Sequence, residues 1–371
     1  MSLLKRATEV AVATLGGAGE TARTEANVRG VHLRPVAEFT HQVTGVAVSR
    51  RGRVFVNFPR WTEDTEVSVA EVLPGSTLRP FPDDDWNAWR NSRKDEMAPA
   101  RHFICVQSVV VDARDHLWVL DPAAPAQSHV VRGGAKLVEI DLATDHVVRT
   151  LLFDEDVAPL GSYLNDVRIS PDGAYAYITD SGAKGALVVV RLADAQAWRV
   201  LDGHASTQPE KDVQIKVDRR VLRRPDGRGV EFAADGIALS TDGHWLYWQA
   251  IKGRTLYRLP TALLQDRGAD AAMLAAAVER VGENGPADGL LISTSGRMYI
   301  SAVEENAVKV REGDEVSTLL QDRRLRWPDS FAEGPDGTVY VTDSRIPDMV
   351  WFRPHGPAQL RTTLYRIEDL R

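Results

Sequence analysis

The sequence has little cysteine and no long hydrophobic run, and both absences exclude classes of protein. Among 371 residues there is one cysteine, Cys105, so an internal disulfide and a cysteine-based metal site are excluded. Cys105 stands in the apolar stretch FICVQSVVV, where we expect a buried, unreactive thiol. No apolar run approaches the roughly 20 residues that a membrane-spanning helix needs. We therefore expect a soluble protein without a membrane partner.

An excess of basic charge is also absent. The chain carries 45 Lys and Arg against 52 Asp and Glu, and its net charge of −7 excludes nucleic acid as an expected partner. The motifs G-x-S-x-G, H-E-x-x-H, the P-loop and G-x-G-x-x-G after a strand are missing. We therefore expect no organic cofactor. With 43% hydrophobic residues, the chain can still bury a large core.

The N-terminal stretch begins with basic residues, but Glu9 interrupts it before any long apolar run. We predict that residues 1–25 are a flexible leader or the remnant of an export signal, and that residues 26–371 form one domain. A cytoplasmic and an exported (periplasmic or secreted) protein both stay open, and so does the oligomeric state.

What the sequence has in abundance is internal repetition. The stretch LNDVRISPDGAYAYITDSG alternates apolar and polar residues on both sides of a Pro-Asp-Gly turn, which is typical of a β-hairpin. Similar hairpins recur along the chain, so that six copies are present. They are TGVAVSRRGRVFVNF, QSVVVDARDHLWVLD, LNDVRISPDGAYAYITDSG, ADGIALSTDGHWLYWQA, ADGLLISTSGRMYISA and PDSFAEGPDGTVYVTDS.

Further strand-like runs follow the hairpins, among them KLVEIDL, ALVVVRL, TLYRLP and AVKVREG. Six units of about four strands predict an all-β fold, a six-bladed β-propeller of four-stranded antiparallel blades. Residues 32–39 and 362–369 are the strand-like segments left over, so we expect them to pair and close the ring. Polar insertions are expected at 59–101 and 204–230, and a short helix at 269–281.

One polar column emerges when the hairpins are aligned on their turns. Each copy has a polar residue where its first strand begins, and in a propeller the first strands line the axis. We therefore expect these side chains to converge. They are Thr44, Gln107, Asn165, Asp235, Asp288 and Asp329.

Several carboxylates in a confined space require a cation, a proton or a cationic ligand. Oxygen-only ligands favour a hard ion, so we predict a divalent metal, Ca²⁺ foremost, held by the column residues of blades three to six. These are Asn165, Asp235, Asp288 and Asp329. The alternative is that each caps a loop by binding backbone N–H groups.

The second strands return to the same end and stop at the acidic residues Asp121, Asp180 and Asp343. We expect Gln107, Asp180 and Asp343 to surround a ligand pocket, and its floor is expected to be formed by Asn165, Asp235, Asp288 and Asp329. Trp86 and Trp89 in DDDWNAWR are candidates to cover the channel mouth and stack on a flat ligand. Packing of a long loop is an equally good explanation for both tryptophans. Asp235 and Asp288 are the candidate general bases.

Several separate segments match one known family in order. SYLNDVRISPDGAYAYITDSGAKGALVVVRL, GRGVEFAADGIALSTDGHWLYWQAIKGRTLYRLP, VQSVVVDARDHLWVLD and RWPDSFAEGPDGTVYVTDS resemble the Yellow and major royal jelly protein family, especially its bacterial members. The resemblance extends over roughly residues 31–371. It implies a six-bladed propeller with a ligand site at one end of the axis. The family's insect members include proteins linked to dopachrome conversion and salivary binders of biogenic amines, so membership does not fix one activity.

The hairpins are more distantly similar to those of calcium-dependent gluconolactonases, whose metal is held by a Glu, two Asn and an Asp at blade entries. In this chain Asn165 and Asp235 or Asp288 stand where such ligands would stand. The first blade departs from that pattern because Thr44 occupies the place of the Glu.

Two hypotheses about function follow. The first is an enzyme that acts on a small polar or aromatic ring compound, by lactone or ester hydrolysis or by tautomerisation, with metal assistance. The second is a non-catalytic protein that binds a small molecule such as a biogenic amine against the carboxylates. A pure interaction scaffold is disfavoured because it has no need to concentrate charge at its axis.

Overall fold

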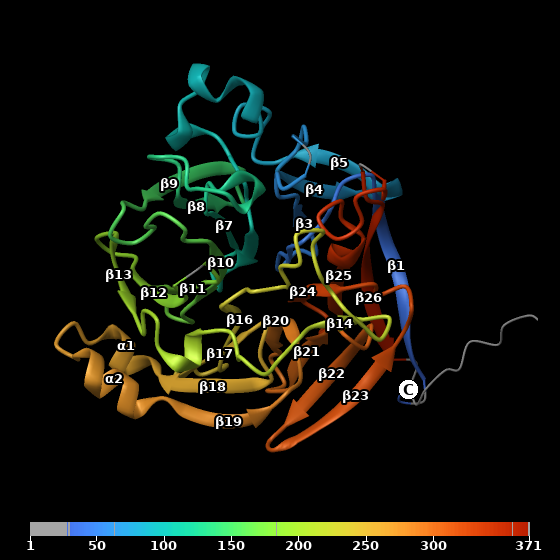
Figure 1. Ribbon diagram of the computed structural model, residues 1–371. Coiled ribbons are helices and arrows are strands. Elements are labelled where there is room, and N and C mark those ends of the chain that lie inside the picture. The colour runs from blue at the N-terminus through green and yellow to red at the C-terminus, as the bar shows by residue number, and fades with distance from the viewer. Residues whose placement is uncertain (1–27, 29, 63, 183, 358, 370–371) are drawn as a thin grey trace, which may run out of the picture.

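The protein folds as a ring of β-sheets around a central axis (Figure 1). The computed structural model describes residues 28, 30–62, 64–182, 184–357 and 359–369. In these residues there are six four-stranded antiparallel sheets and one two-stranded sheet. The predicted six-bladed propeller is therefore confirmed, and the predicted leader lies outside the described residues.

Each blade except the last is built from four consecutive strands. Blade 1 contains β2 (Val46–Val48), β3 (Val54–Asn57), β4 (Val69–Leu73) and β5 (Thr77–Pro80); blade 2 contains β6 (Ser108–Val111), β7 (His116–Asp121), β8 (Lys136–Asp141) and β9 (His146–Leu152). Blade 3 contains β10 (Leu164–Ile169), β11 (Tyr175–Asp180), β12 (Ala186–Arg191) and β13 (Gln196–Val200). Blade 4 contains β16 (Ala234–Leu239), β17 (Trp245–Ala250), β18 (Thr255–Pro260) and β19 (Glu279–Glu283). Blade 5 contains β20 (Ala287–Ile292), β21 (Met298–Ala302), β22 (Ala307–Glu312) and β23 (Glu315–Gln321).

Blade 6 closes the ring with strands from both ends of the chain. Its order is β24 (Pro328–Glu333), β25 (Val339–Asp343), β26 (Thr362–Asp369) and β1 (Val31–Phe39), and β1 pairs antiparallel with β26 as predicted. The first strands of successive blades contact one another around the whole circle, including β24 with β2. These contacts place the first strands next to the axis.

The core lies between blades because each sheet buries both faces against its neighbours. The third strands β8 and β12 are accordingly buried along nearly their whole length, and β12 is apolar from Ala186 to Val190. One interblade cluster, for example, joins Tyr177 and Leu187 of blade 3 to Ile237 and Trp248 of blade 4.

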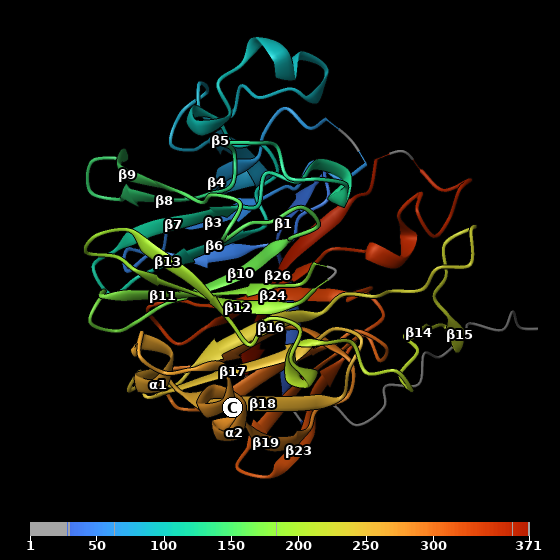
Figure 2. The same ribbon diagram turned by 60° about the vertical axis from the view of Figure 1, so that its left-hand side comes forward.

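The connecting segments add little regular structure. They contain the hairpin β14 (Lys216–Val217) and β15 (Arg220–Val221), the helices α1 (Thr261–Gln265) and α2 (Ala271–Ala277), and short 3₁₀ turns at Pro74–Ser76, Asn91–Glu96, Pro99–Arg101, Pro125–Gln127, Ala205–Thr207 and Ile346–Asp348. Within the described part of the chain, no helix is long and apolar enough to cross a membrane. The β14–β15 hairpin and the segment between β25 and β26 project from the same side of the molecule (Figure 2).

Two expected boundaries need correction. The predicted polar insertion at 59–101 contains β4 and β5, the outer strands of blade 1, because the apolar residues of β4 are needed to complete that blade. The predicted helix at 269–281 ends at Ala277, since Glu279–Glu283 pairs with β18 as the fourth strand of blade 4. The edge of a sheet overrides the local helical pattern there.

Candidate active site

The polar column predicted from the hairpins lies where the first strands of the blades begin. Its members are almost completely buried: the exposed fraction is 0% for Thr44, 8% for Gln107, 7% for Asn165, 3% for Asp235, 6% for Asp288 and 5% for Asp329. Because the first strands surround the axis, these side chains gather at one end of it.

A chain of hydrogen bonds links the acidic members of the column. The amide nitrogen Nδ2 of Asn165 donates to Oδ1 of Asp235 at 2.6 Å. The carboxyl groups of Asp235 and Asp288 lie close enough for each to change the pKa of the other. The indole nitrogen of Trp327 donates to Oδ2 of Asp288 at 2.6 Å. Blades 3, 4 and 5 and the residue before β24 therefore share one polar site.

Crowding in a buried place changes how these carboxyl groups ionise. Burial raises the pKa of Asp235 well above its ordinary value, and the negative charge of Asp288 raises it further. Burial also raises the pKa of Asp288, to about 6, against the opposing effect of the Trp327 hydrogen bond. The pKa of Asp329 is raised well above its ordinary value by burial and by the charge of Asp288. Such a group needs protons or a cation to balance its charge.

The inner end of the site is closed by Arg168, which the sequence reasoning did not identify. Its guanidinium donates to Oδ1 of Asp166 at 2.8 Å and to the carbonyl oxygen of Leu290 at 2.7 Å. Because Asp166 is in blade 3 and Leu290 in blade 5, these bonds connect first strands of two blades that are not neighbours. Asp166 directly follows Asn165, and the irregular register at the start of β10 explains why both consecutive residues reach the site.

On the other side, an aromatic wall adjoins Gln107. The indole nitrogen of Trp61 donates to the hydroxyl of Tyr163 at 2.5 Å, and that hydroxyl donates to Oε1 of Gln107 at 2.9 Å. Trp61, Tyr163 and Trp327 belong to one apolar cluster formed largely by residues that precede the blades or lie in the long connections. The sequence reasoning missed all three, although Trp327 stands two residues before Asp329.

The two tryptophans predicted to cover the channel have the contacts of packing residues. Trp89 is fully buried in the same cluster as Trp61, and its indole nitrogen donates to Asn91 at 2.9 Å. Trp86 packs on Phe103 with ring centroids 5.0 Å apart. Contact of either tryptophan with a ligand stays a prediction.

The aspartates at the ends of the second strands face the backbone. Asp121 accepts the N–H groups of Ile104 and Cys105 and pairs with Lys136 at 2.9 Å. Asp180 accepts the N–H of Tyr163 at 2.7 Å and pairs with Arg199 at 2.7 Å.

Asp343 has the equivalent place in blade 6, but its Oδ1 atom is buried without a hydrogen-bond partner, and burial raises its pKa to about 7. Asp121 and Asp180 thus anchor the segments that lead into the column. A direct contact of Asp180 or Asp343 with a ligand stays a prediction.

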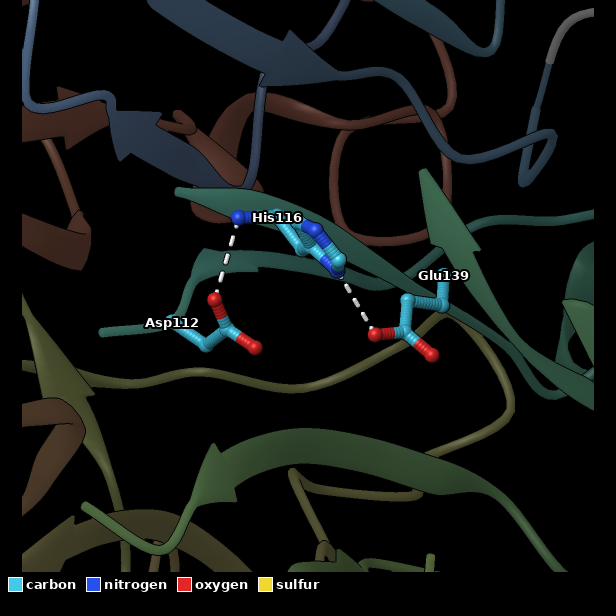
Figure 3. A group of neighbouring side chains, drawn as sticks. All are labelled: Asp112, His116 and Glu139. Atoms are coloured by element: carbon cyan, nitrogen blue, oxygen red, sulfur yellow. Dashed lines mark hydrogen bonds and ion pairs between the residues drawn. The ribbon is translucent and has the colours of Figure 1, made fainter. Parts of the chain in front are cut away.

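A second cluster consists of Asp112 and His116, which bound the turn between β6 and β7, and of Glu139 on β8 (Figure 3). Their ligand atoms lie within 4.8 Å of one another, and among the described residues this is the one group of three or more His, Cys, Asp or Glu side chains placed so closely. Arg114 bonds both carboxylates at 2.9 and 2.8 Å, and Arg149 bonds Glu139 at 2.5 Å. Because arginines already balance these acids, the cluster is an ion-pair network that fixes the turn.

Taken together, the fold and the acidic site define a six-bladed β-propeller with a buried cluster of polar and acidic side chains at one end of its axis. Residues 104–349 match the model of the major royal jelly protein family. The chain belongs to this family, as the sequence resemblance implied. Comparison with curated protein sequences finds no match.

Solved structures with the same fold are distant in sequence. A gluconolactonase from Xanthomonas campestris is 13% identical, with a TM-score of 0.54 over 92% of this chain and 90% of that chain. A luciferin-regenerating enzyme is 12% identical, with a TM-score of 0.55 over 92% and 96%. The calcium-binding protein regucalcin from Agrobacterium tumefaciens is 14% identical, with a TM-score of 0.53 over 90% and 94%. At these identities the likeness shows the fold.

Proposed function

We propose that this protein is an enzyme that acts on a small polar or aromatic ring compound in the axial pocket, by hydrolysis of a lactone or ester or by a dopachrome-like tautomerisation. The observation that carries the proposal is the hydrogen-bonded set of buried carboxyl groups around Asp235 and Asp288. Two carboxyl groups in different environments can serve as proton donor and proton acceptor in one reaction. The gluconolactonase and the luciferin-regenerating enzyme with this fold support an enzyme of lactonase type.

The roles of the two aspartates follow from their partners. Asp288 accepts a hydrogen bond from Trp327, which favours its ionised form, so it acts as the base that takes a proton from water or from a ring carbon. Asp235 keeps its proton more strongly and donates it to the leaving ring oxygen or to the substrate carbonyl oxygen. In hydrolysis the water oxygen bonds to the carbonyl carbon while the ring C–O bond breaks. Arg168 and the apolar cluster around Trp61 restrict the entry of other water.

The chemistry of the donor set suits a divalent cation, while the carboxyl oxygens of Asp235, Asp288 and Asp329 do not all lie within 4.8 Å of one another. Asn165, Asp235, Asp288 and Asp329 offer oxygen ligands, which suits Ca²⁺, and the charge of Arg168 is already paired with Asp166 and does not balance the three buried carboxyl groups. When bound, such a cation supplies Lewis-acid polarisation of a substrate carbonyl.

A non-catalytic binder of amine-like small molecules is the second candidate. It is favoured by one observation: Trp61 and Tyr163 belong to the same buried cluster as Trp327, whose indole nitrogen donates to Asp288 of the acidic set. Carboxylates and aromatic faces together attract cationic ligands.

The test begins with a metal content assay, followed by a screen of lactones, esters and catecholamine-derived quinones. With an active substrate we expect Asp235→Asn and Asp288→Asn to lower kcat/KM at least about 100-fold, the usual range for loss of an acid–base group. The melting temperature should stay unchanged or rise, because charge repulsion is relieved.

The matched control is Asp194→Asn, which changes an exposed aspartate paired with Arg191 on the outer part of blade 3. Full activity in both axial variants would refute the proposal. A ligand that binds the parent without turnover, and no longer binds the axial variants, would favour the binder instead.

A further inference from the structure

Four arginines gather around two aspartates at the end of blade 6; we call Arg220, Arg326, Arg345 and Arg353 the arginine cluster. Arg326 binds both oxygens of Asp218 at 2.9 and 2.8 Å. Arg326, Arg345 and Arg353 all approach Asp348, at 3.2, 2.9 and 3.2 Å. The positive charge of Arg220 also acts on Asp218.

The charges of this cluster do not balance. Arg326, Arg345 and Arg353 share the carboxylates of Asp218 and Asp348, and Arg220 adds a fourth positive charge nearby, so four positive charges against two negative ones leave a net charge of +2 on these residues. The buried Asp348 side chain is 8% exposed, whereas the side chains of Arg345 and Arg353 are 38% and 52% exposed. The carboxylate therefore lies inside, and guanidinium N–H groups remain accessible outside. Such forked donors suit carboxylate and phosphate oxygens.

The cluster is close in the chain to the acidic residues at the axis. Arg326 precedes Asp329 by three residues, so their backbones lie within about 11 Å of each other. Arg345 follows Asp343, the last residue of β25, by two residues, and holds a left-handed backbone with φ of 54°. For a residue other than glycine this conformation costs energy and is often retained at functional sites.

Aromatic rings connect the cluster to the pocket wall. Trp351 lies in the same segment as Arg353, and the Arg224 guanidinium is 4.5 Å from the centre of its ring. Trp351 and Trp61 have centroids 6.1 Å apart, and Trp61 bonds Tyr163 beside Gln107. A flat ring placed along these side chains can therefore reach from the cluster toward the acidic site.

We propose that the arginine cluster binds an oxyanion, a carboxylate or a phosphate, which the small-molecule ligand of the axial pocket carries on its ring. The inference rests on the proposed function in one respect, namely that the ligand enters this pocket. The acidic floor repels an anion, so the charged group stays at Arg345 and Arg353 and the ring enters with its neutral or cationic part first. The ligand class is then a flat ring compound with one anionic substituent.

The probes are inorganic phosphate and benzoate, each titrated into the intact protein at low salt and followed by calorimetry. We expect the double variant Arg345→Gln, Arg353→Gln to weaken binding of at least one probe by about tenfold or more. Arg219→Gln is the matched control. Arg219 is an exposed arginine in the β14–β15 hairpin, beside Arg220, and among the described residues it forms no ion pair with Asp218 or Asp348. Its affinity should match that of the parent. Tighter binding of benzoate would indicate that the natural ligand carries a carboxylate, and tighter binding of inorganic phosphate would indicate a phosphate.

A second measurement does not depend on the variants. The arginine Nε–H resonances of the ¹⁵N-labelled parent should shift during the titration, and the resonances that shift should include those missing from the double variant. Absence of binding by both probes, or equal binding by the double variant and the parent, would overturn the inference. Binding at the cluster without any turnover would leave the inference standing and count against the proposed enzyme. Turnover that depends on Asp288, in a protein that binds neither probe, would support the proposed enzyme and overturn the oxyanion inference.

Discussion

At the scale of single residues, Asp121, Asp180 and Asp343 occupy equivalent places but have different partners. Lys136 lies opposite Asp121 across β7 and β8, and Arg199 reaches Asp180 from β13. Opposite Asp343 the strand β26 offers Thr363, and no ion pair with Asp343 is formed within the described residues. Asp343 is therefore the member of this set whose ionised form the fold stabilises least.

This difference predicts how stability depends on pH. The folded pKa of Asp343, about 7, lies above the ordinary aspartate value of about 3.9. The folded state favours the protonated form of Asp343. The contribution of this group to the free energy of unfolding is therefore fully present below about pH 4 and is lost as the pH rises through about 7. Asp343→Asn should therefore raise the free energy of unfolding at pH 8, by up to about 4 kcal/mol, and change it little at pH 4.

Urea denaturation of the parent and the variant at the two pH values checks this. Asp180→Asn is the matched control with the opposite sign: breaking its buried pair with Arg199 should destabilise the protein by about 3–5 kcal/mol at pH 8. Equal effects of both substitutions would show that Asp343 is also paired.

At the scale of elements, the first strands of blades 4, 5 and 6 approach so closely that glycine is required between them. A Cβ atom at Gly236 would lie 2.1 Å from the carbonyl oxygen of Asp288, and one at Gly289 would lie 2.1 Å from that of Asp329. These strands carry the acidic side chains, so the same close approach brings the carboxyl groups together.

We expect Gly289→Ala to destabilise the protein by about 1–3 kcal/mol, because strands β20 and β24 must separate to admit the methyl group. Gly229→Ala is the control, since a Cβ there meets nothing closer than 3.6 Å. Its effect should stay within about 0.5 kcal/mol. Chemical denaturation measures both. If the Gly289→Ala variant were as stable as the parent, the claim that β20 and β24 are too close to admit a methyl group at position 289 would be wrong.

At the scale of the whole molecule, ring closure depends on one strand from the start of the described chain. Strand β1 pairs with β26 over nearly its whole length and completes blade 6. Without β1, β26 would present an unpaired edge and the cluster of Val31, Leu33 and Tyr365 would be opened.

Deletion of residues 1–40 should therefore lower the unfolding midpoint in urea strongly and promote association through the exposed edge of β26. Deletion of residues 1–25, the predicted leader, is the control and should leave both properties unchanged. Light scattering after size exclusion and urea denaturation measure the outcome. A stable monomer lacking residues 1–40 would show that the ring does not need this closure.

The sequence by itself determined the blade count, the closing strands and the column from Thr44 to Asp329. Each of these depends on a pattern that repeats locally, a strand alternation or a residue at a fixed place in a hairpin, and rotation of the repeat carries it into space. Trp327, Asp166 and the outer strands β4 and β5 carry no comparable periodic signal.

Only the tertiary structure decided what surrounds the column. Arg168 reaches the carbonyl of Leu290 over 122 residues of chain, and Trp61 reaches Tyr163 over 102. Arg326 pairs with Asp218, 108 residues away, to form part of the arginine cluster. Nothing in the local sequence specifies such partners. The first bond depends on how the first strands β10 and β20 are placed around the axis, and the other two depend on the packing of the connecting segments over one end of the ring. The same packing sets the burial that raises the pKa values of Asp235, Asp288 and Asp329.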